Sequence, residues 1–163
     1  MPATLPLLRA ALTTGEIGPP PLTAYAVTSS LREWYADGDL EELEYAATLT
    51  AARASLRLLA EDASAVARRV VVAADVDDGI VRPVPDLDRA AVLLTEPVAM
   101  TLVASAHVDG AAASEVIGRA VAVVRHADVG DDDAAFLVDE AQAHELQWYA
   151  TQELEGLLGE ALE

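Results

Sequence analysis

The segment Arg69–Val76 constrains the fold more than any other part of this chain. It reads RVVVAADV, and from Val70 to Ala74 it contains only β-branched and small apolar residues. β-branched residues favour extended strands, and a strand without alternation of apolar and polar residues is typically buried on both faces. We therefore expect a central strand here, with other elements packed against both of its faces.

The segment 40–61 predicts a long helix. Its apolar residues recur at spacings of three and four, at Leu40, Leu43, Ala47, Ala51, Ala54 and Leu58. A second apolar row widens this face, so the helix is expected to be mostly buried. Asp39 precedes it as an N-cap residue.

The remaining pattern alternates helices with strands. Helices are expected over 5–14, 29–36 and 111–125, after the aspartates 131–133, and from Thr151 to about 159. Strands are expected over 22–27, 91–95, 98–108 and 145–150, with a hairpin at Glu96–Pro97 and an irregular stretch over 80–88. This order predicts an α+β fold in which a mixed β-sheet of about five strands packs against helices, within a single domain over 1–163.

The charge balance excludes several classes of function. The chain has 28 acidic and 10 basic residues, the bases are all Arg, and the formal net charge is −18. Such a chain repels phosphate backbones and anionic lipid, so we expect no nucleic-acid or membrane binding. The absence of Cys removes disulfides, thiol nucleophiles and thiolate zinc sites.

The acidity is concentrated in the C-terminal part, from about residue 127. Residues 127–163 contain 11 acids and no base. Two interpretations remain open: a solvated flank that keeps the protein in solution, or a docking surface for a basic protein partner.

The N-terminal segment has no basic region, long apolar run or cleavage signature, and the apolar stretches elsewhere are too short for a spanning helix. We therefore expect a cytoplasmic location.

Eight motifs resemble those of an uncharacterised actinobacterial family, a domain of unknown function. They are Pro2–Leu5, Ala26–Thr28, Leu31–Ala36, Leu43–Ala46, Arg69–Val76, Ser105–Asp109, Val138–Ala141 and His144–Glu153. The resemblance covers nearly the whole chain and implies no activity, cofactor or catalytic residue. It does imply a short strand before the segment that begins at Pro2. An empty position at that sheet edge would expose backbone groups and favour a homodimer.

Ser105, His107 and Asp109 alternate along one strand and have the residue types of a catalytic triad. Neighbours on one face of a strand are about 6.5–7 Å apart, whereas a nucleophile and its base need about 3 Å. We therefore expect a solvated strand face, with His107 free to act with groups from another strand.

Glu140 and His144 are spaced to share one helix face and are weak candidates for metal ligands. Two ligands do not make a zinc site, and Asp75–Gly79 lacks the spacing of a calcium loop. No metal or other cofactor is expected.

The scarce aromatic residues Trp34, Tyr35, Tyr45, Trp148 and Tyr149 are expected to anchor the core rather than line a ligand pocket.

No phosphate loop, dinucleotide motif or nucleophile elbow is present. The leading hypothesis is a non-catalytic domain that acts through protein–protein contacts. The alternative is an enzyme or a small-ligand or metal-binding protein with a site around His107, His144 and Trp148. Its candidate binding residues are His107, Asp109, His144, Glu145, Trp148 and Tyr149.

Overall fold

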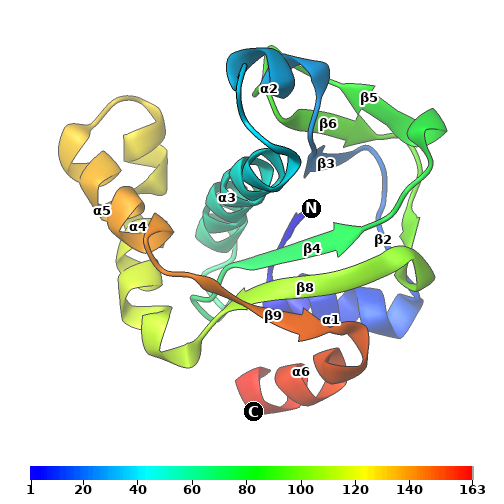
Figure 1. Ribbon diagram of the computed structural model, residues 1–163. Helices are drawn as coiled ribbons and strands as arrows, with labels where there is room; N and C mark the ends of the chain where they lie inside the picture. The colour runs from blue at the N-terminus through cyan, green and yellow to red at the C-terminus, as the bar shows by residue number, and fades with distance from the viewer. Residues whose placement is uncertain (163) are drawn as a thin grey trace.

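The structure is a computed structural model that describes residues 1–162, with six helices in this range (Figure 1). They are α1 (Leu5–Thr14), α2 (Ser29–Trp34), α3 (Leu40–Glu61), α4 (Ser114–Asp128), α5 (Asp132–Gln142) and α6 (Leu154–Leu162).

Capping explains where several helices begin. Thr4, Thr28 and Asp131 each accept a hydrogen bond from a first-turn backbone N–H through a side-chain oxygen. At α3, Asp39 and Glu42 form a capping box, so the helix starts at the residue that the sequence predicts. Thr151 opens a short 3-10 turn before α6 instead of capping the helix itself.

The strands form three separate sheets. They are β1 (Pro2–Ala3), β2 (Glu16–Ile17), β3 (Leu22–Tyr25), β4 (Val70–Ala74), β5 (Val81–Pro83), β6 (Ala91–Leu94), β7 (Val98–Ala99), β8 (Val103–Asp109) and β9 (Leu146–Ala150). Their orders are β1-β4-β8-β9, β2-β7 and β3-β6-β5, and each pairing is antiparallel.

The α+β class is therefore confirmed, but one mixed sheet of five strands is wrong. The hairpin expected at Glu96–Pro97 does not form, because β6 pairs with β3 and β5 whereas β8 pairs with β4 and β9. A 3-10 turn at Met100–Leu102 interrupts the apolar run 98–108 and directs the chain from one sheet into another. The stretch 80–88, expected to be irregular, contributes β5.

Both faces of β4 are covered, as the run of valines predicts. Val70 and Val72 pack with Leu5 and Leu8 of α1 and with Leu154 of α6. On the other face, Val71 packs against Ala51 and Ala52 of α3. The pair α4 and α5 lies farther out against α3, where Leu56, Ile117, Val124 and Val138 form a second apolar cluster (Figure 1).

The edge position beside β4 is occupied. Pro2 and Ala3 form β1 and pair with Val71 and Val70, and Met1 exchanges backbone hydrogen bonds with Val72. The position beside β4 that was expected to be empty is therefore occupied by Met1, Pro2 and Ala3.

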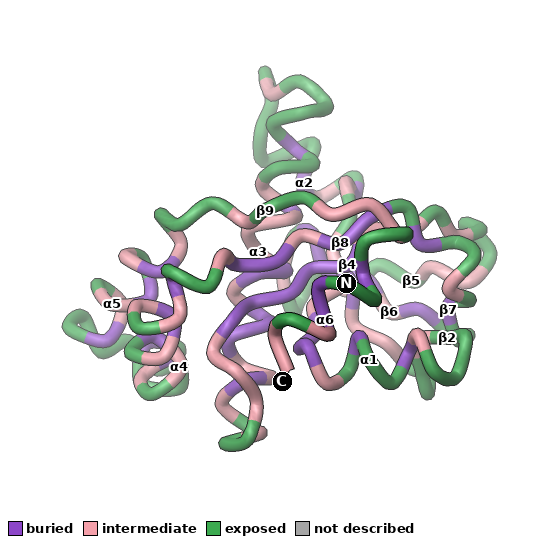
Figure 2. Tube along the Cα trace, turned by 90° about the horizontal axis from the view of Figure 1, so that it is seen from below, coloured by how far each residue is buried: buried purple, intermediate pink, exposed green. Residues whose placement is uncertain are grey.

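The four-stranded sheet and the three-stranded sheet meet at an angle, with α3 lying between their ends (Figure 1). Buried residues concentrate along β4, β8 and the inner face of α3, while β9 runs along the outside (Figure 2). A hollow lies between α3, the four-stranded sheet and the three-stranded sheet.

Candidate functional site

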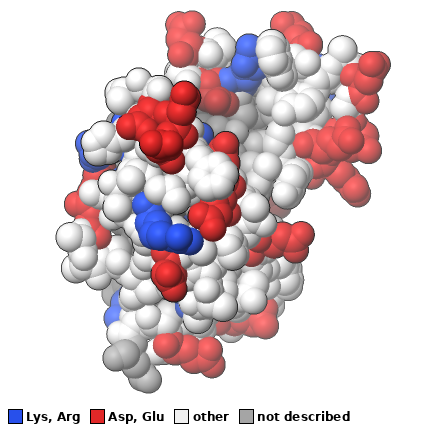
Figure 3. Space-filling view, turned by 90° about the vertical axis from the view of Figure 1, so that its left-hand side faces the viewer, with Lys and Arg blue, Asp and Glu red and all other residues white. Residues whose placement is uncertain are grey.

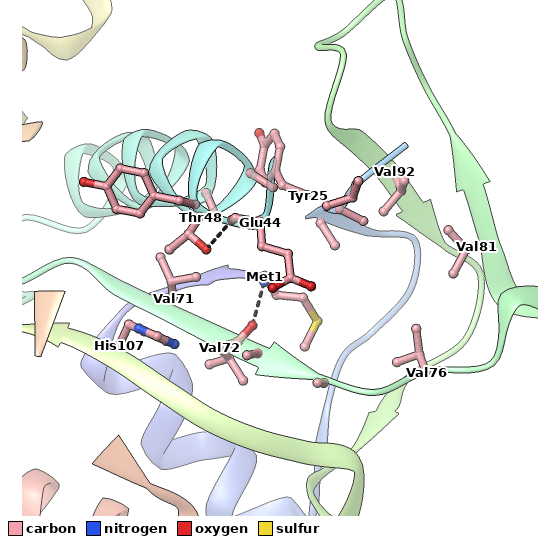
Figure 4. Close-up of a pocket in the computed structure, with 18 of the residues that line it drawn as sticks. Met1, Tyr25, Glu44, Thr48, Val71, Val72, Val76, Val81, Val92 and His107 are labelled. Atoms are coloured by element: carbon pink, nitrogen blue, oxygen red, sulfur yellow. Dashed lines mark hydrogen bonds between the residues drawn. The ribbon is translucent and has the colours of Figure 1, made fainter. Parts of the chain in front are cut away.

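The hollow between α3 and the two sheets is a cavity of about 730 Å³. Its floor is β4, from Val71 to Ala74, and one wall is the N-terminal half of α3. Aliphatic side chains from the three-stranded sheet β3-β6-β5 form the opposite wall. They include Val81 and Val92, which Figure 4 labels, and Leu94. A mainly apolar interior of this size is typical of small-molecule sites.

The polar groups that line this cavity are the Met1 amino group and the side chains of Tyr25, Arg32, Glu44, Tyr45, Thr48 and His107. The Glu44 side chain points from α3 toward Met1, and the Met1 amino group donates a 2.7 Å hydrogen bond to the carbonyl of Val72 (Figure 4). Burial lowers the pKa of that amino group to about 5. Thr48 uses its hydroxyl internally, donating to the Glu44 carbonyl at 2.9 Å.

His107 lies on β8, directly across from Val71 of β4, and its half-buried ring lines the cavity. Burial lowers the pKa of His107, and the nearby amino group of Met1 lowers it further whenever that group is protonated. The imidazole is therefore held in its neutral form at neutral pH, in which one ring nitrogen accepts a hydrogen bond.

Ser105 and His107 are closer than the strand geometry predicts. Ser105 Oγ lies 3.4 Å from His107 Nε2, because the side chains lean toward each other along β8. The expected separation is wrong for this pair, and the expected solvated strand face is also wrong, because Ser105 and Asp109 are buried. The third member of the motif, Asp109, interacts elsewhere, so the three residues do not form a triad.

Asp109 is fully buried and bound to Arg69. Its Oδ1 and Oδ2 accept hydrogen bonds from Arg69 Nη2 at 2.8 Å and Nε at 2.9 Å. Oδ2 also accepts from the Arg69 backbone N–H at 2.7 Å. Asp109 was a candidate ligand-binding residue, but these contacts occupy its carboxylate and make it structural.

The family comparison covers nearly the whole chain. A model of family DUF6912, described as a family of unknown function, matches residues 1–158. The chain belongs to this DUF6912 family. No curated protein and no solved structure gives a significant match.

In the DUF6912 chain, Trp148 lies on β9 beside His107 and its side chain is 60% exposed. Tyr149 points to the other face of the sheet, where it packs against the core next to α1 and α6, and its hydroxyl donates to Gln147 Oε1. The two aromatic candidates are therefore on opposite faces.

His144 and Glu145 are exposed in the loop before β9. The backbone carbonyl of His144 accepts a hydrogen bond from Arg69 Nη2 at 2.8 Å, whereas Glu140 faces Arg119 at 3.4 Å. Within residues 1–162, no group of three potential metal-ligating side chains comes together.

Most of the aromatic residues do not anchor the core of the DUF6912 chain. Trp34 and Tyr45 are 62% and 61% exposed, and Tyr35 is also exposed. The Cζ atom of Arg89 lies 3.7 Å from the centroid of the Trp34 ring. Tyr45 lines the cavity. The core is built mainly from alanine, valine and leucine, so the expectation of aromatic anchors is wrong for Trp34, Tyr35, Tyr45 and Trp148, whereas Tyr149 packs against the core.

The acidic C-terminal part includes α5 and α6, which lie in separate parts of the fold. α5 packs against α4, whereas α6 packs against α1 on the far side of the central sheet (Figure 1). On the face formed by α4 and α5, acidic side chains lie in separate groups with Arg between them (Figure 3). Residues 127–162 therefore do not present one continuous acidic surface.

The sequence points to His107 but not to Glu44 or the valines of the cavity, and it assigns Tyr45 to the core rather than to a pocket. These residues come from separate segments that meet only in the folded chain, and the motifs to which several of them belong imply no site residue.

No helix within residues 1–162 combines the length and the apolar character needed to cross a bilayer.

Proposed function

We propose that this DUF6912 chain is a binding domain whose cavity holds a small, mainly apolar and uncharged molecule. The observation that carries the proposal is the cavity of about 730 Å³ between α3 and the two sheets. Its size lies within the usual range for ligand sites, and its walls are mainly apolar.

The polar groups around the cavity favour an uncharged ligand. Glu44 and Arg32 both line it, so a carboxylate and a guanidinium face the same space. A ligand with a net charge of either sign would be attracted by one and repelled by the other. A hydroxyl or amide head group can bond to either, and the neutral His107 ring adds one acceptor.

Binding is favoured over catalysis because the polar groups are not arranged for chemistry. Ser105 and His107 are in contact, but Asp109, which would orient the imidazole in a triad, is bound to Arg69.

The experiment is a fluorescence titration with N-phenyl-1-naphthylamine, an uncharged probe that emits strongly in apolar surroundings. Octanol should displace the probe, whereas octanoate and octylamine should displace it weakly. Equal displacement by all three would contradict the neutral-ligand assignment.

Cavity-filling variants show where the probe binds. Ala73 lies on β4 and lines the cavity, so Ala73→Phe should remove most of the probe signal. Ala99→Phe is the matched control, because Ala99 is an exposed strand residue on β7. Undiminished binding by the folded Ala73→Phe variant would overturn the proposal.

We also propose that the domain works in the cytoplasm of an actinobacterium. The Lys-free, Arg-based composition and the motifs that resemble an actinobacterial family support this. Cell fractionation of an actinobacterium that encodes the chain tests it, and recovery with secreted proteins would contradict it.

A further inference from the structure

Strand β9 is an outer strand of the four-stranded sheet. β8 is its one hydrogen-bonded neighbour within residues 1–162, and β9 runs along the outside of the molecule (Figures 1 and 2). Its five residues pair with β8 in unbroken register. It contains no Pro, Lys or bulge, the usual features that protect a strand edge from pairing.

Two hydrogen bonds show which backbone groups face outward. The Asp109 N–H donates to the Arg69 carbonyl, so the backbone groups of Asp109 point toward β4. In an antiparallel strand this direction alternates, so every second residue of β8 points toward β4 and the residues between them point toward β9. By the register, Gln147 and Tyr149 then pair with β8, and Leu146, Trp148 and Ala150 face outward. The Ala150 N–H agrees with this, because it donates to Glu153 Oε2 and not to β8.

The open part of the edge is therefore the stretch around Leu146 and Trp148. Trp148 adds a large, 60% exposed apolar side chain at its centre. Trp is enriched at the energetically dominant positions of protein interfaces. Backbone pairing supplies affinity in strand addition, and side chains such as Trp148 supply specificity.

The charges at the two ends of β9 indicate the partner. Exposed Glu145 precedes the strand and exposed Glu153 follows it, and residues 127–163 contain no Lys or Arg. A second copy that paired antiparallel through β9 would bring these acids against each other, which disfavours a homodimer at this edge. A strand with basic residues at its ends is complementary.

We propose that β9 binds an extended, basic segment of another protein by strand addition. The segment pairs with the outward backbone groups of Leu146 and Trp148, packs on the Trp148 ring and places Arg or Lys beside Glu145 and Glu153.

The first test uses three fluorescein-labelled peptides and measures anisotropy. One alternates Thr and Val between terminal Arg residues, the second has Glu in place of Arg, and the third keeps Arg but carries alternate Pro residues that prevent pairing. The first should bind about tenfold more tightly than either of the others, as expected for lost backbone and charge contacts. Equal affinity of the two basic peptides would show charge attraction only and overturn the proposal.

Two substitutions at one position separate backbone from side chain. Trp148→Ala removes the ring and keeps the outward N–H, whereas Trp148→Pro removes both and leaves the β8 ladder intact. The Pro variant should bind the basic peptide more weakly than the Ala variant, and Glu145→Gln should also weaken it. Phe136→Ala, at an exposed position on α5, is the control and should bind normally.

Hydrogen exchange on the unmodified protein tests the proposal even if the Trp148→Pro variant does not fold. The basic peptide should slow exchange of the Leu146 and Trp148 amides. Unchanged exchange at saturating peptide would contradict strand addition. A dimer that forms without peptide and protects these amides would assign the edge to a second copy instead. The Ala73→Phe variant should still bind the peptide, so failure of the cavity proposal is distinguishable from failure of this one.

Discussion

Arg69 and Asp109 form an ion pair in the interior of the protein. Arg69 Nη2 lies 2.8 Å from Asp109 Oδ1, and the side chains are 1% and 0% exposed. Arg69 Nη1 also donates to Gln142 Oε1, and Nη2 donates to the carbonyl of His144, each at 2.8 Å. The pair therefore joins β8 and the residue directly before β4 to the end of α5 and to the loop that leads into β9.

Removing one partner of this pair should destabilise the fold strongly. Asp109→Ala leaves the Arg69 charge buried without a counter-ion, which typically costs about 3–5 kcal/mol. Urea unfolding measures the loss, and Asp139→Asn, at an exposed position on α5, should change the free energy of unfolding very little. A loss below about 1 kcal/mol for Asp109→Ala would contradict the interpretation.

Ser55 should contribute to holding the first strand in place. Its buried hydroxyl donates to the Ala3 carbonyl at 2.7 Å and accepts from the Val70 N–H at 3.0 Å. Ser55→Ala leaves both groups without this partner and should lower the free energy of unfolding by about 1–3 kcal/mol. The exposed Ser64→Ala variant is the control, and an equal effect of the two substitutions in thermal unfolding would refute the assignment.

Asp128 should make stability depend on acid pH. The hydrogen bond from Arg57, at 2.6 Å, and the weaker one from Arg53 lower the pKa of Asp128 below its ordinary 3.8. A lowered carboxyl pKa stabilises the folded state above the ordinary value, and that contribution disappears as the pH falls through the folded-state pKa.

Because the pair is partly exposed, Asp128→Asn should reduce the free energy of unfolding by at most about 1 kcal/mol at neutral pH. The difference from the unmodified protein should close in acid. A gap that stays constant from neutral pH down to strongly acid pH would show that charge is not its source.

His107 should titrate below its ordinary pKa of 6.5, because burial opposes protonation of its ring. The unfolded chain then takes up the proton more readily, so this residue makes the fold less stable as the pH falls below about 6.5. NMR titration of the His107 ring protons measures the pKa. Filling the cavity should lower it further, and a pKa at or above the ordinary value would contradict the placement of His107.

The sequence predicts best where one segment determines its own environment. The spacing of Leu43, Ala47 and Ala51 and the cap at Asp39 locate α3 to the residue. The valines of β4 predict burial on both faces, because little but a central strand accommodates them. These features depend on local periodicity and capping, which one sequence contains.

Pairing between strands is not determined locally. Val98 and Val103 look like one continuous strand, but the turn at Met100–Leu102 sends them to different sheets. The same limit applies to Asp109, whose partner Arg69 is 40 residues away. Trp34 and Tyr45 are exposed because the alanines and valines of this chain already fill the core.

The candidate site was predicted only in part, for the same reason. His107 was identified and lines the cavity, whereas Asp109 proved structural and Glu44 was missed. A cavity is a property of how α3 and two sheets meet, so it has no signature within any one of them.

The central claim is that the cavity binds a small apolar molecule, and methyl-resolved NMR during titration with N-phenyl-1-naphthylamine tests it most directly. We predict saturable shifts of the methyl signals of Val71, Val81 and Val92, which line the cavity. The signals of Val124 and Val138, buried between α4 and α5, should not move. Shifts confined to Val124 and Val138, or none at saturating probe, would contradict the account.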